Sequence, residues 1–251
     1  MQLHCLGTAG YHPNETRQTS CYFLPESGIL LDAGTGLFRL TEHLCTDTLD
    51  ILISHAHLDH IAGLTFLIDV LYQRPVDRIR IWGEAKKLEA IREHLFAPLV
   101  FPVPLQAEWM PIDAQSLFRI GDCEVSWRRQ EHPGGSVGYR LAWPGGPKLL
   151  YLTDTTGDVS DEAARWNSDA DLMMHECYFS QEYSEWAEKT GHTATHRVAE
   201  IASAAMPSKL LLTHANPLSE SADELLAETR ARLTRPIETL LAEDGLAVEF
   251  G

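Results

Sequence analysis

The feature that most constrains this chain is a short turn crowded with metal-binding side chains. The turn has the pattern H-x-H-x-D-H over residues 55–60, between an apolar run at 49–53 that predicts a buried strand and a segment at 61–72 with helical apolar spacing. Imidazole nitrogens and carboxylate oxygens are ligands that zinc accepts, and such a turn can point alternate side chains into one cavity. We therefore interpret it as a ligand turn and not as a loop rich in histidine by chance. The candidate ligands are His55, His57, Asp59 and His60.

Charge and cysteine content exclude several classes of protein. The 251 residues suffice for one large domain or two fused halves, and 44% apolar with 22% charged residues is typical of a globular chain. A formal charge of −16 without a basic run argues against a binder of long nucleic acid, which needs Lys and Arg on phosphates. Five scattered cysteines without a C-x-x-C pair predict neither a disulfide framework nor a thiolate zinc site.

Apolar runs and the first residues bear on the cellular location. No apolar run reaches membrane-spanning length, and residues 1–5 lack the basic and then apolar design of a secretory signal. We therefore expect a cytoplasmic protein that has no membrane partner.

Three further candidate ligands each follow a predicted strand. They are His132, Asp154 and His214. Because polar groups at the carboxyl ends of strands converge on one rim of a sheet, we expect them to join the 55–60 turn. Five histidines and two aspartates suffice for two metals that share a carboxylate.

Two aspartates have an ordinary alternative explanation. Asp154 could cap a helix, although Asp158 or Ser160 could take that task and leave Asp154 free to bridge metals. Asp32 stands at a strand end before a glycine turn, so it is either an exposed turn carboxylate or an acceptor that orients a ligand histidine through its other nitrogen.

The order of predicted elements indicates the fold class. Strands alternate with helices in both halves, which favours an α/β fold of two sheets packed face to face with helices outside, a four-layer αββα sandwich. The clearest hairpin surrounds the Pro-Gly-Gly-Pro turn at 144–147, and a polar helix over about 220–233 precedes a closing strand at 246–250. We expect a single domain, 1–251, with pseudo-symmetric halves of approximately 1–130 and 131–251.

The order of the polar motifs resembles the metallo-β-lactamase superfamily, and within it the ribonuclease Z-like phosphodiesterase branch. The resemblance covers nearly the whole chain and implies the αββα fold and a metal-dependent hydrolase. The matching stretches beyond the 55–60 turn are Leu6-Gly7-Thr8, Leu31-Asp32-Ala33-Gly34, His132 before Gly138-Tyr139-Arg140, Asp154, His175-Glu176, Gly191-His192-Thr193 and His214.

The resemblance implies two Zn²⁺ ions, with Mn²⁺ or Fe²⁺ as alternatives. The implied ligands are His55, His57 and His132 for one ion, Asp59, His60 and His214 for the other, and Asp154 as the bridge. The oxygen-reducing diiron branch has a similar pattern but carries Glu at the place of His57, so the resemblance favours a hydrolase.

The resemblance also implies the catalytic residues. The metal pair would activate a bridging water that Asp59 orients, and His192, held by Glu176, would protonate the leaving alkoxide. The alternative for His192 and Glu176 is a helix-capping turn and a strand-end charge. These two motifs separate the ribonuclease Z-like branch from the glyoxalase and lactamase branches.

One element of ribonuclease Z is missing. The long arm that grips tRNA would lie between His132 and Asp154, where this chain has only the 144–147 turn and its strands. We therefore expect a phosphodiesterase acting on a small or cyclic nucleotide-type phosphodiester, and structured RNA is disfavoured as a partner. The alternatives are a tRNA 3′-end endonuclease, a hydrolase of a lactone, thioester or β-lactam, and a non-catalytic binding module; a homodimer is left open.

Overall fold

The computed structural model describes residues 1–218 and 222–251 of the chain, which form two compact units. The first unit contains Met1–Gly121 and Glu243–Glu249, and the second contains Asp122–Ala242 and Phe250–Gly251. The chain therefore returns to its first unit near the end. The expectation of a single hydrolase domain with two similar halves stays a prediction.

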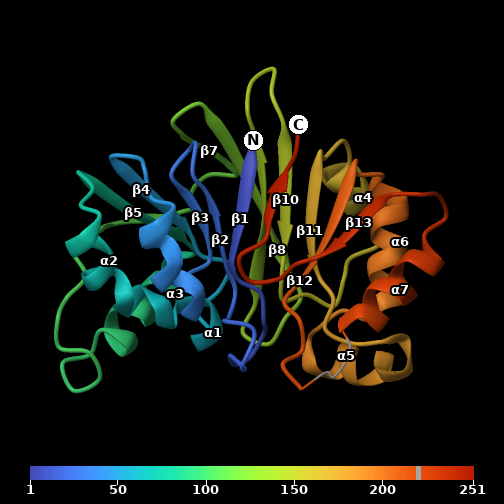
Figure 1. The fold of residues 1–251 in the computed structure, drawn as a ribbon, viewed down its shortest axis with the longest axis horizontal. Coiled ribbons are helices and arrows are strands. Elements are labelled where there is room, and N and C mark those ends of the chain that lie inside the picture. Colours follow the sequence, from blue (N-terminus) through green and yellow to red (C-terminus); the bar gives the residue numbers. More distant parts are fainter. Residues whose placement is uncertain (219–221) are drawn as a thin grey trace. The chain divides into compact units, whose positions relative to one another are not determined.

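The sheet of the first unit is antiparallel at one side and parallel at the other (Figure 1). Its strands, in spatial order, are β14 Ala247–Glu249, β1 Gln2–Gly7, β2 Cys21–Leu24, β3 Ile29–Leu31, β4 Thr48–Leu52, β5 Arg78–Gly83 and β6 Glu108–Pro111. Strands β3 to β6 are parallel, so the carboxyl ends of β3 and β4 meet at one edge. Asp32 and the 55–60 turn follow these two ends. Strand β7, Leu117–Ile120, comes last in the main segment of this unit.

Short helices lie beside this sheet and bury one apolar face against it (Figure 1). They are η1 Thr35–Glu42, α1 Leu58–Ile61, η2 Ala62–Phe66, α2 Leu67–Gln73, α3 Ala85–Ala90 and the π-helix η3 Ile91–Leu95. The helix expected over 61–72 is broken because Gly63 packs against backbone, where an added Cβ would lie 2.0 Å from the carbonyl oxygen of Gly34. The helix expected over 85–96 changes to π geometry at Ile91.

Asp50 is a buried carboxylate that joins β4 to β5. It is 1% exposed, and it accepts hydrogen bonds from Trp82 Nε1 at 2.7 Å and from an Arg80 guanidinium nitrogen at 2.8 Å. We expect Asp50→Ala to lower the free energy of unfolding by about 2–3 kcal/mol, because both donors lose their partner. Urea denaturation followed by circular dichroism measures this, with the exposed Asp77→Ala as control. A loss equal to that of the control would contradict the assignment.

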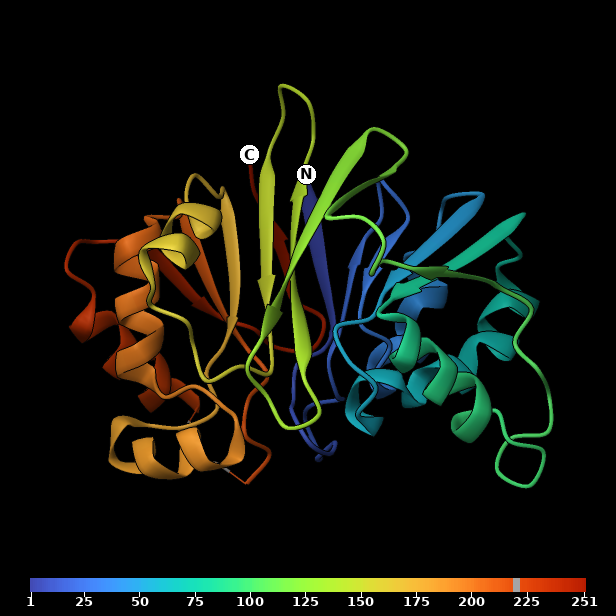
Figure 2. The same ribbon diagram turned by 180° about the vertical axis from the view of Figure 1, so that it is seen from behind.

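The sheet of the second unit has the same mixed character. The strands of this sheet that belong to the second unit are, in spatial order, β13 Glu238–Leu241, β12 Lys209–Thr213, β11 Leu172–Glu176, β10 Lys148–Leu152, β9 Ser136–Ala142 and β8 Cys123–Gln130. Strands β8 to β10 are antiparallel and form the long hairpins of Figure 2, whereas β10 to β13 are parallel. The carboxyl ends of β10, β11 and β12 therefore share an edge, at which Asp154, Glu176 and His214 lie.

Helices also flank the second sheet, and α6 and α7 lie beside β11 to β13 (Figure 1). The helices are α4 Asp161–Asn167, η4 Gln181–Tyr183, α5 Ser184–Thr190, α6 Thr195–Ala205 and α7 Ala222–Arg232. Val198 and Ile201 of α6 belong to the core with Leu150 and Leu210 of the sheet. The Ser160 side chain caps α4 by accepting the Ala163 N–H.

One prediction near the end of the chain meets the structure only in part. The helix expected over 220–233 corresponds to α7, and its first positions, 220 and 221, lie outside the described residues. Strand β13 was not expected. Within the described part of the chain, no helix combines the length and apolar character needed to cross a membrane.

Candidate metal centre

Asp32 organises the histidines of the first unit. It is fully buried directly after β3, with a left-handed backbone at φ 54°. Its Oδ1 accepts the Ser54 backbone N–H at 2.7 Å, and its Oδ2 accepts the Ser54 hydroxyl and His60 Nδ1, each at 2.7 Å. Asp32 is therefore the acceptor that orients a histidine, and the exposed turn carboxylate is the wrong alternative.

These hydrogen bonds determine which imidazole nitrogens carry lone pairs. Because His60 Nδ1–H donates to Asp32, the lone pair of an uncharged ring would lie on Nε2. The Ser54 hydroxyl donates to Asp32 and therefore accepts from His55 Nδ1 at 3.0 Å, so His55 Nε2 also carries a lone pair. The rings of His57 and His60 lie 4.4 Å and 4.3 Å from that of His55.

Asp59 faces one of these lone pairs. Its Oδ2 lies 3.3 Å from His60 Nε2 and accepts the backbone N–H of Tyr11 at 2.7 Å. A carboxylate oxygen and an unprotonated imidazole nitrogen repel at this distance unless a proton or a cation lies between them. Both are ligands that zinc accepts, so the contact fits a bound metal.

Asp154 has the same relation to two histidines in the second unit. It is 2% exposed, has φ 47° and accepts the Thr153 hydroxyl at 2.7 Å. Its Oδ1 lies 3.4 Å from His132 Nε2, and its Oδ2 lies 3.2 Å from His214 Nε2. Each oxygen of one carboxylate thus faces a different imidazole, which is the arrangement that a bridging ligand requires.

His132 is held as a neutral base. Its Nδ1–H donates to the Gly191 carbonyl at 2.8 Å, which leaves a lone pair on Nε2 toward Asp154. Burial lowers the pKa of His132, and the nearby Asp154 only partly opposes this. A neutral ring has no proton to place between His132 Nε2 and the Asp154 oxygen, so a bound cation would relieve the repulsion between these two atoms. The donor types and their protonation therefore fit a divalent metal.

Glu176 connects three segments behind this cluster. Its fully buried carboxylate accepts the Thr155 N–H at 2.6 Å, the Thr193 N–H at 3.3 Å and His192 Nδ1 at 3.1 Å. The contact expected between His192 and Glu176 is present. The role of His192 as proton donor stays a prediction.

His192 lies beside the metal candidates of its own unit. Potential ligand atoms of Asp154, His192 and His214 all lie within 4.8 Å of one another. The ring of Tyr178 stacks on that of His192, with centroids 4.4 Å apart and an interplanar angle of 15°. Tyr178 was not predicted as a site residue. Its position two residues after Glu176 is the one indication that the sequence contains.

The other predicted site residues also divide between the two units. His55, His57, Asp59 and His60 gather in the first unit, and His132, Asp154, Glu176, His192 and His214 gather in the second.

The environment of Asp32 leads to a measurable expectation. We expect Asp32→Asn to lower zinc affinity about 10- to 100-fold, because the NH₂ group of the amide cannot accept from the Ser54 or His60 donor that it would face, and the ligand rings lose their orientation. Competition against a chromophoric zinc chelator measures the affinity, with the exposed Asp77→Asn as control. If both variants bind zinc like the unchanged protein, Asp32 does not orient the ligands.

The comparisons with known proteins agree with this geometry. The model of the beta-lactamase superfamily domain matches residues 28–215, three quarters of the chain. The chain belongs to this superfamily. A curated ribonuclease Z of Gemmatimonas aurantiaca is 26% identical over 298 residues, covering 98% of this chain and 94% of the relative. A ribonuclease Z of Haloarcula marismortui is 28% identical over 306 residues, covering 100% and 97%.

Solved structures of this superfamily show the same fold. The metallo-beta-lactamase fold protein YhfI from Bacillus subtilis has a TM-score of 0.79 and 22% identity, covering 99% of both chains. The short form of human tRNase Z has a TM-score of 0.77 and 23% identity, covering 100% of both chains. The predicted α/β metallo-β-lactamase fold and the ribonuclease Z-like resemblance are confirmed. The chain is a metal-dependent hydrolase.

The aligned lengths also bear on the missing arm. Alignments of 298 and 306 residues exceed the 251 residues of this chain, so these superfamily relatives carry segments that it lacks. Between β9 and β10 the chain has only a tight turn, closed by hydrogen bonds from Trp143 N to Pro147 O at 3.1 Å and from Gly146 N to Trp143 O at 2.9 Å.

Proposed function

We propose that the chain is a cytoplasmic dinuclear zinc phosphodiesterase that cleaves a small or cyclic nucleotide-type phosphodiester. The observation that carries the proposal is the Asp154 carboxylate, whose two oxygens face Nε2 of two different histidines beside His192. Two metals bridged by a carboxylate and flanked by a proton donor suit hydrolysis of a phosphodiester. Manganese or iron are the alternative metals.

Seven residues are proposed as ligands of the metal pair, on the basis of the superfamily resemblance. The proposed ligands are His55, His57, Asp59 and His60 from the first unit and His132, Asp154 and His214 from the second. In each unit a buried histidine whose Nδ1–H is taken turns Nε2 toward a carboxylate oxygen, at 3.3 Å for His60 and 3.4 Å for His132. The resemblance to the superfamily supports assigning all seven residues as ligands.

The chain's own residues would position water and deliver a proton. When bound, the metals supply positive charge for the phosphoryl oxygens and a water of lowered pKa. Asp59, fixed by the Tyr11 N–H, would orient that water for in-line attack. His192 would donate a proton to the departing oxygen, and Glu176 would hold the ring and balance its charge.

The preference for a small substrate depends on charge and on the short β9–β10 turn. The chain has 20 basic residues against 36 acidic ones, which disfavours a long polyanion. The turn at 143–147 leaves no arm between His132 and Asp154 to hold a folded RNA. A small phosphodiester bound chiefly through the metals would need neither feature.

A substrate panel tests the proposed function. The zinc-loaded protein is offered bis-p-nitrophenyl phosphate beside a p-nitrophenyl ester, a lactone, a thioester and a β-lactam. We expect hydrolysis of the phosphodiester, its loss with a chelator and its return with zinc. Hydrolysis of the carbonyl compounds alone would replace phosphodiester cleavage with acyl chemistry on the same metal site.

A tRNA 3′-end endonuclease is the second candidate. Curated relatives named ribonuclease Z align over nearly the whole chain, and this observation favours it. The deciding assay offers intact precursor tRNA at physiological salt beside a dinucleotide. Cleavage of the precursor at the 3′ end with a higher kcat/KM than the dinucleotide would favour the endonuclease and contradict the small substrate.

A further inference from the structure

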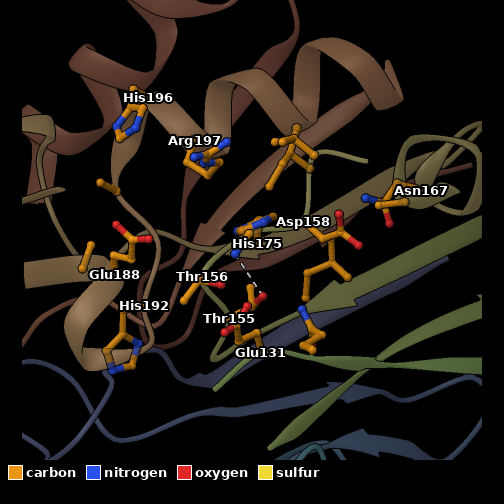
Figure 3. Close-up of a pocket in the computed structure, with 18 of the residues that line it drawn as sticks. Glu131, Thr155, Thr156, Asp158, Asn167, His175, Glu188, His192, His196 and Arg197 are labelled. Atoms are coloured by element: carbon orange, nitrogen blue, oxygen red, sulfur yellow. Dashed lines mark hydrogen bonds between the residues drawn. The ribbon is translucent and has the colours of Figure 1, made fainter. Parts of the chain in front are cut away.

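The ring of His192 borders a cavity in the second unit. This cavity has a volume of about 530 Å³, its wall also includes Thr155 and Glu188, and the His192 side chain is 15% exposed. Figure 3 shows the ring of His192 at one end of the labelled residues, apart from the rings of His175 and His196. Space of this kind offers no packing contact that restrains a ring. His192 therefore keeps one orientation only if other contacts hold it.

The contact with Glu176 restrains one atom of the His192 ring. Nδ1 lies 3.1 Å from one carboxylate oxygen of Glu176 and 3.3 Å from the other. Charge-assisted hydrogen bonds from nitrogen to a carboxylate are usually about 2.7–2.9 Å long, so this contact is a long one. A single hydrogen-bonded atom does not prevent the plane of the ring from tilting about it. A second restraint is needed to fix that plane.

The ring of Tyr178 supplies a restraint of this kind. It stacks on His192 with the centroids 4.4 Å apart and an interplanar angle of 15°. The rings of His132 and His214 are farther from His192, at 5.2 Å and 5.4 Å, and are tilted by 62° and 28°. Tyr178 is thus nearer to His192 and more nearly parallel to it than either of these histidines. Stacked rings at this distance attract each other, so the stack resists tilting of the imidazole.

Backbone hydrogen bonds place the two rings side by side. The Tyr178 N–H donates to the Thr193 carbonyl at 3.1 Å, and Phe179 forms an isolated parallel bridge with Ala194. The segment that follows β11 is therefore paired with the segment that precedes α6, and His192 lies beside Tyr178. Because the main chain makes this pairing, the side chain at position 178 can be changed while the two segments stay together.

We infer that Tyr178 is a positioning residue, whose ring fixes the plane of the His192 imidazole so that Glu176 holds Nδ1 and Nε2 faces the departing oxygen. In the reaction the water oxygen bonds to phosphorus, the bond from phosphorus to the leaving oxygen breaks, and the proton on Nε2 passes to that oxygen. Tyr178 acts through His192 and does not itself transfer a proton. The inference rests on the proposed phosphodiesterase function and on the role of His192 in it.

Rates with two kinds of leaving group test the inference. Tyr178→Leu removes the stacked ring, and Tyr178→Phe keeps it. The alkoxide substrate is a dinucleotide or a cyclic nucleotide, whichever the unchanged protein cleaves faster. We expect Tyr178→Leu to lower kcat for this substrate at least about tenfold with KM unchanged, because the proton donor is misplaced. Hydrolysis of bis-p-nitrophenyl phosphate should be unchanged, since p-nitrophenolate needs no proton.

The conservative variant and a double variant show whether Tyr178 acts through His192. Tyr178→Phe should keep the rate on the alkoxide substrate, and Tyr72→Leu, at a position that is 90% exposed, is the matched control. In the His192→Ala protein, adding Tyr178→Leu should slow the reaction no further. Equal slowing of both substrates by Tyr178→Leu, or a further loss in the His192→Ala protein, overturns the inference.

A ring proton of His192 gives a readout that does not depend on activity. In protein labelled with ¹⁵N at histidine, the Nδ1–H signal of His192 is identified by its loss in His192→Ala. We expect slow exchange of this proton with water in the unchanged protein and in Tyr178→Phe, because Glu176 holds it, and fast exchange in Tyr178→Leu. Tyr178→Thr should behave like Tyr178→Leu and serves if the latter does not fold. Slow exchange in either variant without the ring overturns the inference.

The two sets of measurements separate this inference from the proposed function. A protein that cleaves no phosphodiester but shows the expected change in proton exchange contradicts the proposed function and keeps Tyr178 as the residue that orients His192. A protein that cleaves both substrates, and whose Tyr178→Leu variant keeps its full rate on the alkoxide substrate, contradicts the inference alone.

Discussion

Asp154→Asn is expected to reduce hydrolysis of bis-p-nitrophenyl phosphate at least about a thousandfold and to remove at least one zinc ion per chain. The reason is the position of both carboxylate oxygens, at 3.4 Å from His132 Nε2 and 3.2 Å from His214 Nε2. An asparagine replaces one oxygen with an NH₂ group, which cannot bind a cation and would donate to one imidazole. That hydrogen bond would occupy the lone pair that the metal needs.

Metal analysis of the purified protein measures the first part of this prediction, and initial rates at saturating zinc measure the second. Asp161→Asn, at an exposed position in the first turn of α4, is the matched control and should keep both metal and activity. A variant Asp154→Asn that keeps two zinc ions would show that this carboxylate does not bridge metals. Full metal content with lost activity would instead assign Asp154 to the chemical step.

The ligand candidates could be predicted because their signal is local in sequence. The H-x-H-x-D-H turn follows a buried strand, and Asp154 and His214 each follow another. In parallel strands the carboxyl ends share an edge, so a polar residue just after an apolar run indicates a site without knowledge of tertiary contacts. The structure adds that Asp154 and His214 both have left-handed backbones, with φ of 47° and 55°.

The orientation of these side chains could not be predicted, because distant partners determine it. His60 is held by Asp32, 28 positions earlier, and His132 by the Gly191 carbonyl, 59 positions later. Gly191 must also be a glycine here, since its φ is 82° and an added Cβ would lie 2.2 Å from the Pro133 ring. Apolar periodicity contains no information on such contacts.

Three features of the fold, two elements and one helix break, could not be predicted from the sequence for physical reasons. Strand β13 is a four-residue edge strand that follows Pro236, and its first residue, Glu238, is exposed. Helix α5 is mostly polar and buries only Ala187, so it shows no apolar stripe. The break after α1 depends on the close approach of Gly63 to the backbone of Gly34, which only the tertiary structure reveals.

His192→Ala is the second large expected effect, and it depends on the leaving group. A phosphodiester with a poor alkoxide leaving group should be cleaved about a hundred to ten thousand times more slowly, because the departing oxygen loses its proton donor. Bis-p-nitrophenyl phosphate should be affected far less, since p-nitrophenolate leaves without protonation. The ratio of kcat/KM for the two substrates, in variant and unchanged protein, measures the effect.

Zinc content separates the proton donor from a further metal ligand. Because His192 also lies within 4.8 Å of candidate ligand atoms of Asp154 and His214, its removal would release metal if it were a ligand. We expect the metal to be retained, since Glu176 at 3.1 Å holds His192 Nδ1 and the seven proposed ligands do not include it. The exposed His94→Ala is the control. Equal slowing of both substrates, or loss of zinc, would remove His192 from the role of general acid.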